Sequence, residues 1–416
     1  MNLSVSARYA VRSLLRQRRR TLLSVLGVGI GCMSCLVTIA WIRGEGDLIV
    51  RSAAETGAGH LRIAPKGWAS LRESDLRIDR WRDELARARA MEGVAVATPR
   101  ARANALLAAG TRVAAVEIVG VDPATEQASN RLVRNVTQGR FLAPGDAGST
   151  EVAVVIGEAI AKRLGVGLDD LLMLTMSDAG GEMRAAMLVV VGRVSTGSKE
   201  MDSTICEVPL GDLARLTGRD GAGEIAILLE DHRRLDDFAR RVRADLAGDN
   251  DVLTWADVAP ELRDGVKIDE GFTNATVGIV VILVLLGITS AQLTAVLERR
   301  REFAVLSALG MKGSEMLRLV LAEGLVLGLA GAAAGLLLAL APVYLLSTYG
   351  VDMRWFVEDM DLAMSSFLLE PVLHADMGLW LVPYALAVSL VSTILASIYP
   401  AWFAIRTDAA SALRVD

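Results

Sequence analysis

With 416 residues, a hydrophobic content of 52% and a mean hydropathy of +0.40, the chain is more apolar than expected for a soluble protein with 22% charged residues. The apolar residues must therefore be concentrated in segments. The net charge of −5 gives no indication of a nucleic-acid partner, because such a partner requires a basic surface.

Residues 1–20 are basic and amphipathic. Their charged residues are all arginine, and apolar residues occupy the opposite side of a helical wheel. Two placements fit this pattern equally: an interfacial helix with its arginines among anionic lipid headgroups, or a cytoplasmic helix packed on another subunit. In both, the positive-inside rule places the amino terminus in the cytoplasm.

An apolar run at residues 21–42 is long enough to cross the roughly 30 Å hydrocarbon core of a bilayer, and it predicts the first transmembrane helix. Gly31 and Cys32 within it resemble the end of a lipoprotein signal, which would be cleaved. Cleavage is disfavoured because Gly29, rather than leucine, stands three residues before the cysteine, and because the run continues to Ile42.

Residues 43–272 form a long hydrophilic segment with more acidic than basic residues. Alternating apolar residues predict strands, and segments with helical periodicity predict helices between them. The predicted strands cover residues 94–110, 111–123, 152–157, 171–177, 187–197, 203–210, 224–230 and 252–255, and the predicted helices cover 158–165, 211–218 and 233–248. We expect a mixed α+β domain of one or two lobes, followed by a helix that continues from near Ala256 into the second span.

No motif for nucleotide chemistry or catalysis is evident in the sequence. GRVSTGSK at residues 192–199 comes nearest to an ATP-binding loop, but an extra residue separates the second glycine from the lysine, and Glu200 replaces the magnesium-binding hydroxyl. The histidines His60, His232 and His374 are widely spaced and predict no metal site. We expect a non-catalytic chain that binds no cofactor or metal; a hydrolase assembled from distant residues is the alternative.

Three further apolar windows predict transmembrane helices, at residues 273–297, 317–349 and 378–405. Between the first two of these windows lies the charged segment 298–316, ERRREFAVLSALGMKGSEM, whose arginines place it in the cytoplasm. The connection at 350–377 is acidic and is therefore expected outside. The tail at 406–416 is then cytoplasmic, like the amino terminus.

Polar and small residues in the third predicted span carry further expectations. Glu323 lies less than two turns beyond Arg318, where an unpaired carboxylate costs about 2.5–3.5 kcal/mol. It is either a coupling or pathway residue, or the structural partner of an arginine or hydroxyl near the cytoplasmic face. Glycines at helical spacing predict close helix packing in the same span, at Gly324, Gly328, Gly331 and Gly335.

The segment ERRREFAVLSALGMKGSEMLRLVLAEGLVLGLAGAAAGLLLA closely resembles a block of the FtsX-like ABC-transporter permeases, the group that includes MacB and the lipoprotein-releasing subunits LolC and LolE. The matching positions are Glu298, Arg299, Arg301, Glu302, Ala308 to Gly310, and Glu323. RSLLRQRRRTLLSVLGVGIG near the start and YPAWFAIRTDAASALRVD at the end are also similar to this family. The segment between the first two spans looks closer to LolC and LolE than to MacB.

The resemblance implies a type VII ABC-transporter permease of the cytoplasmic (inner) membrane, with four transmembrane helices and a large extracytoplasmic α+β domain, like the MacB periplasmic core, between the first two. MacB carries its ATPase on the same chain. Here the resemblance implies a separate ABC ATPase in two copies, which binds the ATP and magnesium, and a second permease subunit, the same or homologous. It also implies mechanotransmission, in which closure of the ATPases moves the spans and the exterior domains.

The same resemblance implies that residues 299–309 form a cytoplasmic helix suited to docking on the ATPase. Phe303, Leu306 and Leu309 give it an apolar edge, and charged residues flank that edge. The predicted coupling residues are Glu298, Arg299, Arg301, Glu302, Phe303, Leu306, Leu309 and Gly310.

The cargo is open at the level of sequence. The leading expectation is release of a lipoprotein or other amphiphile from the membrane lipid, with a periplasmic acceptor as a further partner. The alternatives are MacB-like efflux of peptides or drugs, and FtsX-like signalling to an extracytoplasmic hydrolase.

Overall fold

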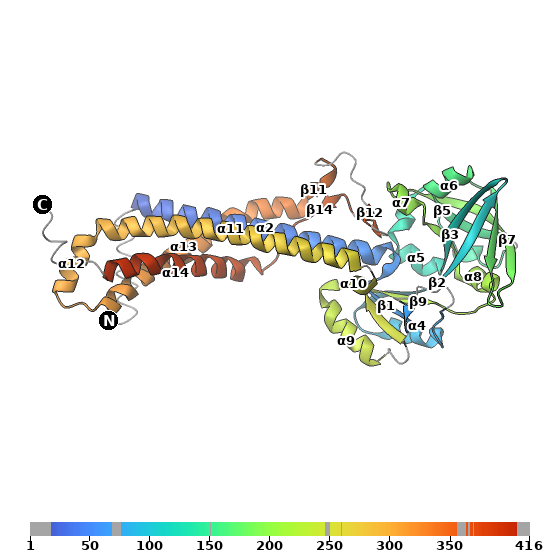
Figure 1. Cartoon of the computed structure of the whole chain (residues 1–416), viewed down its shortest axis with the longest axis horizontal. Helices are drawn as coiled ribbons and strands as arrows, with labels where there is room; N and C mark the ends of the chain where they lie inside the picture. The colour runs from blue at the N-terminus through green and yellow to red at the C-terminus, as the bar shows by residue number, and fades with distance from the viewer. Residues whose placement is uncertain are drawn as a thin grey trace. The chain divides into compact units, whose positions relative to one another are not determined.

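The computed structural model describes residues 18–68, 76–149, 151–245, 250–258, 260–355, 363–364, 367–368 and 370–405. The chain separates into two compact units, drawn in Figure 1. Unit 1 takes residues up to 45, 267–351 and those from 372 onward; unit 2 takes 46–266 and 352–371. The helix predicted at 1–20 lies almost entirely outside the described residues, and the tail at 406–416 lies entirely outside them.

Four helices in the described part of the chain are long and apolar enough to cross a membrane. They are α2 (Arg18–Ala53), α11 (Pro260–Glu298), α13 (Gly313–Thr348) and α14 (Leu381–Ile405). The prediction of four transmembrane helices is confirmed, and so is the helix that continues into the second span, because α11 already begins at Pro260. A short helix, α12 (Arg300–Ala308), stands between α11 and α13 in the chain.

Glycines of α13 allow close packing of the helices in unit 1. A β-carbon on Gly328 would lie 2.3 Å from Oγ1 of Thr393 on α14, and one on Gly331 would lie 2.3 Å from Cγ1 of Val28 on α2. Ser389 of α14 also donates a hydrogen bond to the carbonyl of Gly328, at 2.7 Å. Small residues and interhelical hydrogen bonds of this kind hold helices together in lipid, as the glycine spacing predicted.

A ten-stranded sheet is the framework of unit 2. Its strands are β1 (Leu61–Pro65), β2 (Val94–Ala109), β3 (Arg112–Val121), β4 (Val136–Gly139), β5 (Val152–Gly157), β6 (Leu171–Ser177), β7 (Met183–Val194), β8 (Cys206–Pro209), β9 (Glu224–Leu229) and β10 (Asn250–Thr254). The order is β10-β1-β9-β2-β3-β8-β5-β7-β4, with β6 paired to β2 and β7. The pairs β3–β8 and β5–β7 are parallel, and the other pairs are antiparallel.

Short helices connect these strands and pack on the sheet. They are α4 (Trp81–Ala90), α5 (Pro123–Ser129), α6 (Glu158–Leu164), α7 (Lys199–Asp202), α8 (Leu210–Thr217), α9 (Leu235–Asp245) and α10 (Trp255–Val258). Tighter or wider turns are η1 (Ala54–Ala58), η2 (Arg131–Asn135), η3 (Pro144–Asp146), η4 (His232–Arg234) and η5 (Met353–Trp355), and the two-residue strands are β11 (Val351–Asp352), β12 (Ala363–Met364), β13 (Phe367–Leu368) and β14 (Val372–Leu373). The expected α+β domain between the first two spans is therefore confirmed.

The two faces of β2 differ, and this difference positions the sites described below. Alternate residues of a strand point to opposite faces. Ala101, Ala105 and Leu107 point into an apolar core that contains Ile160 of α6 and Leu213 of α8. Arg100 and Arg102 alternate with these residues along β2 and point to the other face.

Candidate functional site

The predicted coupling segment, residues 298–316, contains α12 and the start of α13. Arg299 links the two helices: it donates through Nε to Glu302 at 3.0 Å and through Nη1 to Glu323 at 2.8 Å. Its guanidinium also lies over the Phe303 ring, 5.2 Å from the centroid. The side chains of Arg299 and Glu323 are only 11% and 14% exposed. Glu323 therefore has an arginine partner, which was the structural alternative raised by the sequence.

The remaining coupling residues divide into buried and exposed groups. Phe303 is 2% exposed and packs in a cluster with Val296, Met316 and Leu319. The side chain of Leu306 lies outside the described residues. The exposed members of the segment include Glu298, Arg301, Glu302, Val305, Leu309 and Gly310. Because Leu309 is 79% exposed, it offers a partner an apolar contact that the buried Phe303 does not.

A second candidate site lies where α2 ends, in unit 2. The helix passes into the π-helical turn η1, in which Gly57 has a φ of +104°. Arg100 of β2 donates through Nη1 to the carbonyl of Gly57 at 2.7 Å, and a β-carbon on Gly57 would lie 1.9 Å from the same nitrogen. Glycine is required at this position both for the positive φ and for the close approach of the guanidinium.

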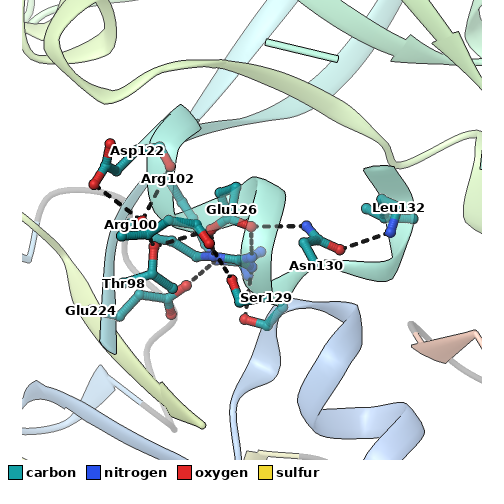
Figure 2. Close-up of polar contacts among 11 residues, drawn as sticks. Thr98, Arg100, Arg102, Asp122, Glu126, Ser129, Asn130, Leu132 and Glu224 are labelled. Carbon is teal, nitrogen blue, oxygen red and sulfur yellow. Dashed lines mark hydrogen bonds and ion pairs between the residues drawn. The ribbon is translucent and has the colours of Figure 1, made fainter. Parts of the chain in front are cut away.

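Arg100 is itself held by Glu126 of α5, as Figure 2 shows. Nε of Arg100 lies 2.7 Å from Oε1 of Glu126, and Nη2 lies 2.5 Å from Oε2, with both side chains buried. Thr98 and Asn130 also donate to the Glu126 carboxylate, at 3.3 and 3.0 Å. A buried ion pair is retained at low cost only when such hydrogen bonds satisfy its remaining donors and acceptors. The pair therefore acts as a rigid link between β2 and α5.

Arg131 of η2 makes a second link to the same turn. It pairs with Glu55 of η1 and, at 2.8 Å, with Glu370. The backbone N–H of Leu132 donates to the side chain of Asn130 at 3.0 Å, which fixes the start of η2. We use the name η1 anchor for Glu55, Gly57, Arg100, Glu126 and Arg131, which together join the end of α2 to β2, α5 and η2.

The sequence that resembles an ATP-binding loop folds without a helix suited to phosphate. Its glycines fall at the end of β7 and in the following turn, and Ser198 caps the one-turn helix α7 by accepting from the N–H of Met201 at 3.4 Å.

Two histidines that are distant in the sequence lie close together in the structure. The His60 and His232 rings stack with centroids 6.0 Å apart. Among the described residues, no group of three or more His, Cys, Asp or Glu side chains could hold a metal ion.

Comparison with known proteins matches most of the chain. A family model of the MacB-like periplasmic core domain matches residues 21–245, and one of the FtsX-like permease C-terminal region matches residues 274–409. The lipoprotein-releasing system transmembrane protein LolC of Xylella fastidiosa (strain 9a5c) is 24% identical over 100% of this chain and 99% of its own length. The LolC protein of Neisseria meningitidis serogroup B is 23% identical over 95% of this chain and 94% of its own.

The macrolide export ATP-binding/permease protein MacB of Hyphomonas neptunium is 23% identical over 87% of this chain, which corresponds to 57% of the relative. Among solved structures, the periplasmic region of MacB from Actinobacillus actinomycetemcomitans aligns with 50% of this chain and 94% of its own, at 14% identity and a TM-score of 0.36.

Proposed function

The chain belongs to the ABC-transporter permeases that join a MacB-like periplasmic core domain to an FtsX-like permease C-terminal region, and we propose that it works by mechanotransmission. In this proposal a separate ABC ATPase, in two copies, binds ATP and magnesium and supplies the energy. The permease chain itself binds no cofactor. It pairs with a second permease subunit, the same or homologous, and converts ATPase closure into movement of the extracytoplasmic domain.

The observation that carries this proposal is the contact of Arg299 with both α12 and α13. A force applied to α12 reaches Glu323 of α13 through a pair that is largely shielded from water, and Phe303 packs beside it. Ion pairs excluded from water are stiff, because breaking them leaves an uncompensated charge. The exposed residues Arg301, Glu302 and Leu309 provide the surface on which the ATPase docks.

The η1 anchor supports the proposal at the other end of α2. Helix α2 is continuous from Arg18 to Ala53 and leads directly into η1. Two contacts hold this turn: Arg100, itself paired with Glu126, donates to the carbonyl of Gly57, and Arg131 pairs with Glu55. Movement of α2 is therefore passed to β2 and η2 rather than absorbed by a flexible connection.

For localisation we propose the inner membrane, with both termini and the segment 298–316 in the cytoplasm and residues 43–272 outside. The arginines that precede the first span and follow the second support this orientation. A reporter fused after residue 310 should be found in the cytoplasm, and one fused after residue 200 should be found outside. The reverse result for either fusion would contradict the orientation.

For the cargo we propose a lipoprotein or other amphiphile. The support is that relatives matched over nearly their whole length are named as components of lipoprotein-releasing systems, whereas the macrolide exporter is matched over 57% of its length. The test is reconstitution of the chain with its ATPase and second permease in liposomes that hold a fluorescent diacylated lipoprotein. ATP should release the lipoprotein to a periplasmic acceptor protein, and ADP should not. ATP-dependent transport of a macrolide without lipoprotein release would favour the efflux alternative.

A further inference from the structure

The charged face of β2 continues onto neighbouring strands of unit 2. Its side chains change from charged to apolar along the strand, in the order Arg100, Arg102, Asn104 and Leu106. In the sheet register Arg102 lies opposite Val119 of β3, and Val119 pairs with Glu207 of β8. Paired residues of neighbouring strands point to the same face. Glu207 therefore shares this face with the two arginines.

A cavity of about 680 Å³ lies over this face. One part of its lining is polar and includes Arg100, Arg102 and Glu207; another part is apolar and includes Leu106, Met183 and Ile205. Cavities that bind small molecules have volumes of roughly 300–1,000 Å³ and combine an apolar lining with a few polar groups. In its size and lining the cavity is suited to an amphiphilic ligand.

The arginines at the cavity already have carboxylate partners. The pairs are Arg100–Glu126, Arg102–Glu117 at 2.7 Å and Arg102–Glu224 at 3.3 Å. Burial alone would raise the pKa of Glu224, but Arg62, Arg102 and Arg100 outweigh it and hold that pKa below its usual range. An anionic ligand would have to displace one of these carboxylates, which disfavours anion binding.

Glu207 has no such partner. Its side chain is 95% buried, being 5% exposed, and its Oε2 atom makes no hydrogen bond within the part of the chain that the structure describes. Burial and the nearby Glu126 carboxylate raise the pKa of Glu207 to about 7, against the lowering effect of Arg100 and Arg102. Buried carboxylates are normally hydrogen-bonded. Since Glu207 lines the cavity, its unpartnered carboxylate oxygen marks a position for a donor from a ligand.

We propose that this cavity binds a small amphiphile with a protonated amine, whose ammonium group pairs with Glu207 while its apolar chain packs against Leu106 and Met183. The ammonium supplies the hydrogen-bond donor that Glu207 lacks and compensates its charge. Flexible methionine side chains adapt to chains of different shape. The site is separate from the coupling segment, and ligand binding requires neither the ATPase nor any particular cargo, so it is tested independently of the proposed function.

The test uses the full chain in nanodiscs of zwitterionic lipid, titrated with octylammonium at pH 8 by isothermal calorimetry. Empty nanodiscs give the heat of partition into lipid, which is subtracted. The expected result is saturable binding to one site, weakened at least tenfold in Glu207→Gln. Glu92→Gln is the control: it removes an exposed carboxylate of the same unit that does not line the cavity, and it should change the affinity less than threefold.

Two further titrations make the assignment specific. Octanol and octanoate should bind more weakly than octylammonium, because neither carries a cation. The affinity for octylammonium should fall from pH 8 to pH 6 in the wild type, because Glu207 takes up a proton over this range, and it should stay level in Glu207→Gln. The other charged groups facing Glu207 are Arg100 and Arg102 from β2 and Glu126 from α5.

The result that would overturn the proposal is an isotherm that is the same for wild type, Glu207→Gln and empty nanodiscs, since this means partition into lipid alone. Tighter binding of octanoate than of octylammonium would overturn the ligand class. If Glu207→Gln lowers the melting temperature of the chain, Leu106→Ser replaces it as the test variant. Leu106 is a half-exposed side chain in the apolar part of the cavity, and its truncation should weaken octylammonium binding severalfold without unfolding the domain.

Discussion

At the scale of single residues, the two candidate sites are built around arginines that face more than one carboxylate or carbonyl. Arg299 contacts Glu302 and Glu323, and Arg100 contacts Glu126 and the carbonyl of Gly57. The planar guanidinium presents several donors in a fixed arrangement. Each arginine can therefore hold two elements in a defined orientation, which a lysine could not do with the same geometry.

The Arg299–Glu323 pair can be measured by a double-mutant cycle. Arg299→Ala leaves the largely buried Glu323 carboxylate without its partner and should lower the free energy of unfolding by about 2–4 kcal/mol. Adding Glu323→Gln should recover part of this loss, with a coupling energy of about 1–3 kcal/mol. Thermal or denaturant unfolding of the purified chain in detergent gives these values. Additive effects of the two substitutions would mean that the pair is not an energetic link.

Because of His60, we expect the domain between the first two spans to lose stability at acid pH. Burial and, to a lesser extent, the neighbouring His232 lower the pKa of His60 to about 4, while its Nδ1 accepts from the N–H of Leu229 at 3.0 Å. Because the folded pKa lies below the unfolded value of about 6.5, the unfolded state binds the proton first. The contribution of His60 to stability is full above pH 6.5 and falls by at most about 3 kcal/mol as the pH drops towards 4.

Melting temperatures of wild type and His60→Gln between pH 7 and pH 4.5 check this expectation. Glutamine keeps an acceptor but does not titrate, so the variant should lose less stability over this interval. Carboxylates with a lowered pKa, such as Asp146 and Asp178, lose their contribution only at lower pH and do not interfere. Equal slopes for the two proteins would contradict the assignment.

Most contacts between individual side chains could not be predicted from the sequence, because the residues that make them lie far apart along the chain. Arg100, Glu126 and Gly57 come from β2, α5 and η1, and their meeting depends on the packed sheet. Glu323 is an exception. A carboxylate close to Arg318 near the cytoplasmic end of an apolar window predicts a nearby partner, because the cost of leaving it unpaired in the membrane is high.

At the scale of elements, α12 exposes a different face from the one that the sequence predicted for docking. The sequence assigned Phe303, Leu306 and Leu309 to one apolar edge, but the structure buries Phe303 and leaves Leu309 and Val305 exposed. The helical period explains part of this difference, since residues 302, 305 and 309 lie together on a helix surface. Phe303 then supports the orientation of the helix rather than the contact with a partner.

Docking through the exposed side of α12 predicts a clear difference between two substitutions. Leu309→Asp should reduce co-purification of the ATPase at least tenfold, which corresponds to loss of at least about 1.4 kcal/mol of binding, and leave the melting temperature unchanged. Phe303→Asp should instead destabilise the chain, because it buries a carboxylate in the cluster around Met316.

The control for docking is Val113→Asp, a substitution of an exposed apolar residue on β3 in the other unit. It should leave ATPase binding unchanged. Normal co-purification with Leu309→Asp would exclude this face of α12 as the docking surface.

Elements with local signals were predicted well. The alternating patterns of β2, β3 and β6 and the periodic patterns of α8 and α9 fall where the sequence placed them, within a few residues. The strand β1 was missed because it has only five residues and gains its stability from pairing with β9 and β10, which are remote in the chain. The helix α5 was also missed, although Asp122 followed by Pro123 is a good start signal for a helix and Asp122 does cap it.

At the scale of the whole molecule, the chain has two units that share two long helices. The helices α2 and α11 each contribute residues to both units, and no other described segment of comparable length does so. Apolar windows and arginine placement predict this arrangement, because a membrane restricts the lengths and charges of the segments that cross it. The cavity at Glu207 had no counterpart in the sequence, since its lining comes from strands brought together only by the fold.

We propose that ATP hydrolysis on a partner moves the extracytoplasmic domain through the η1 anchor. Gly57→Ala is suited to testing it, because the added methyl group meets both a positive φ and the Arg100 guanidinium. Gly110→Ala is the matched control, since Gly110 has a φ of +58° in the turn between β2 and β3 with open space around it. A fluorophore can be attached through Glu92→Cys, an exposed position, because the native Cys32, Cys35 and Cys206 are buried.

The most direct measurement is energy transfer from this fluorophore to acceptors in the lipid headgroups, recorded with the ATPase activity of the reconstituted complex. We expect a change in transfer efficiency on ATP binding and hydrolysis in the wild type and in Gly110→Ala. In Gly57→Ala the change should be lost or greatly reduced while ATP hydrolysis continues. Constant transfer through the ATP cycle in the wild type, or a full change in Gly57→Ala, would contradict the account.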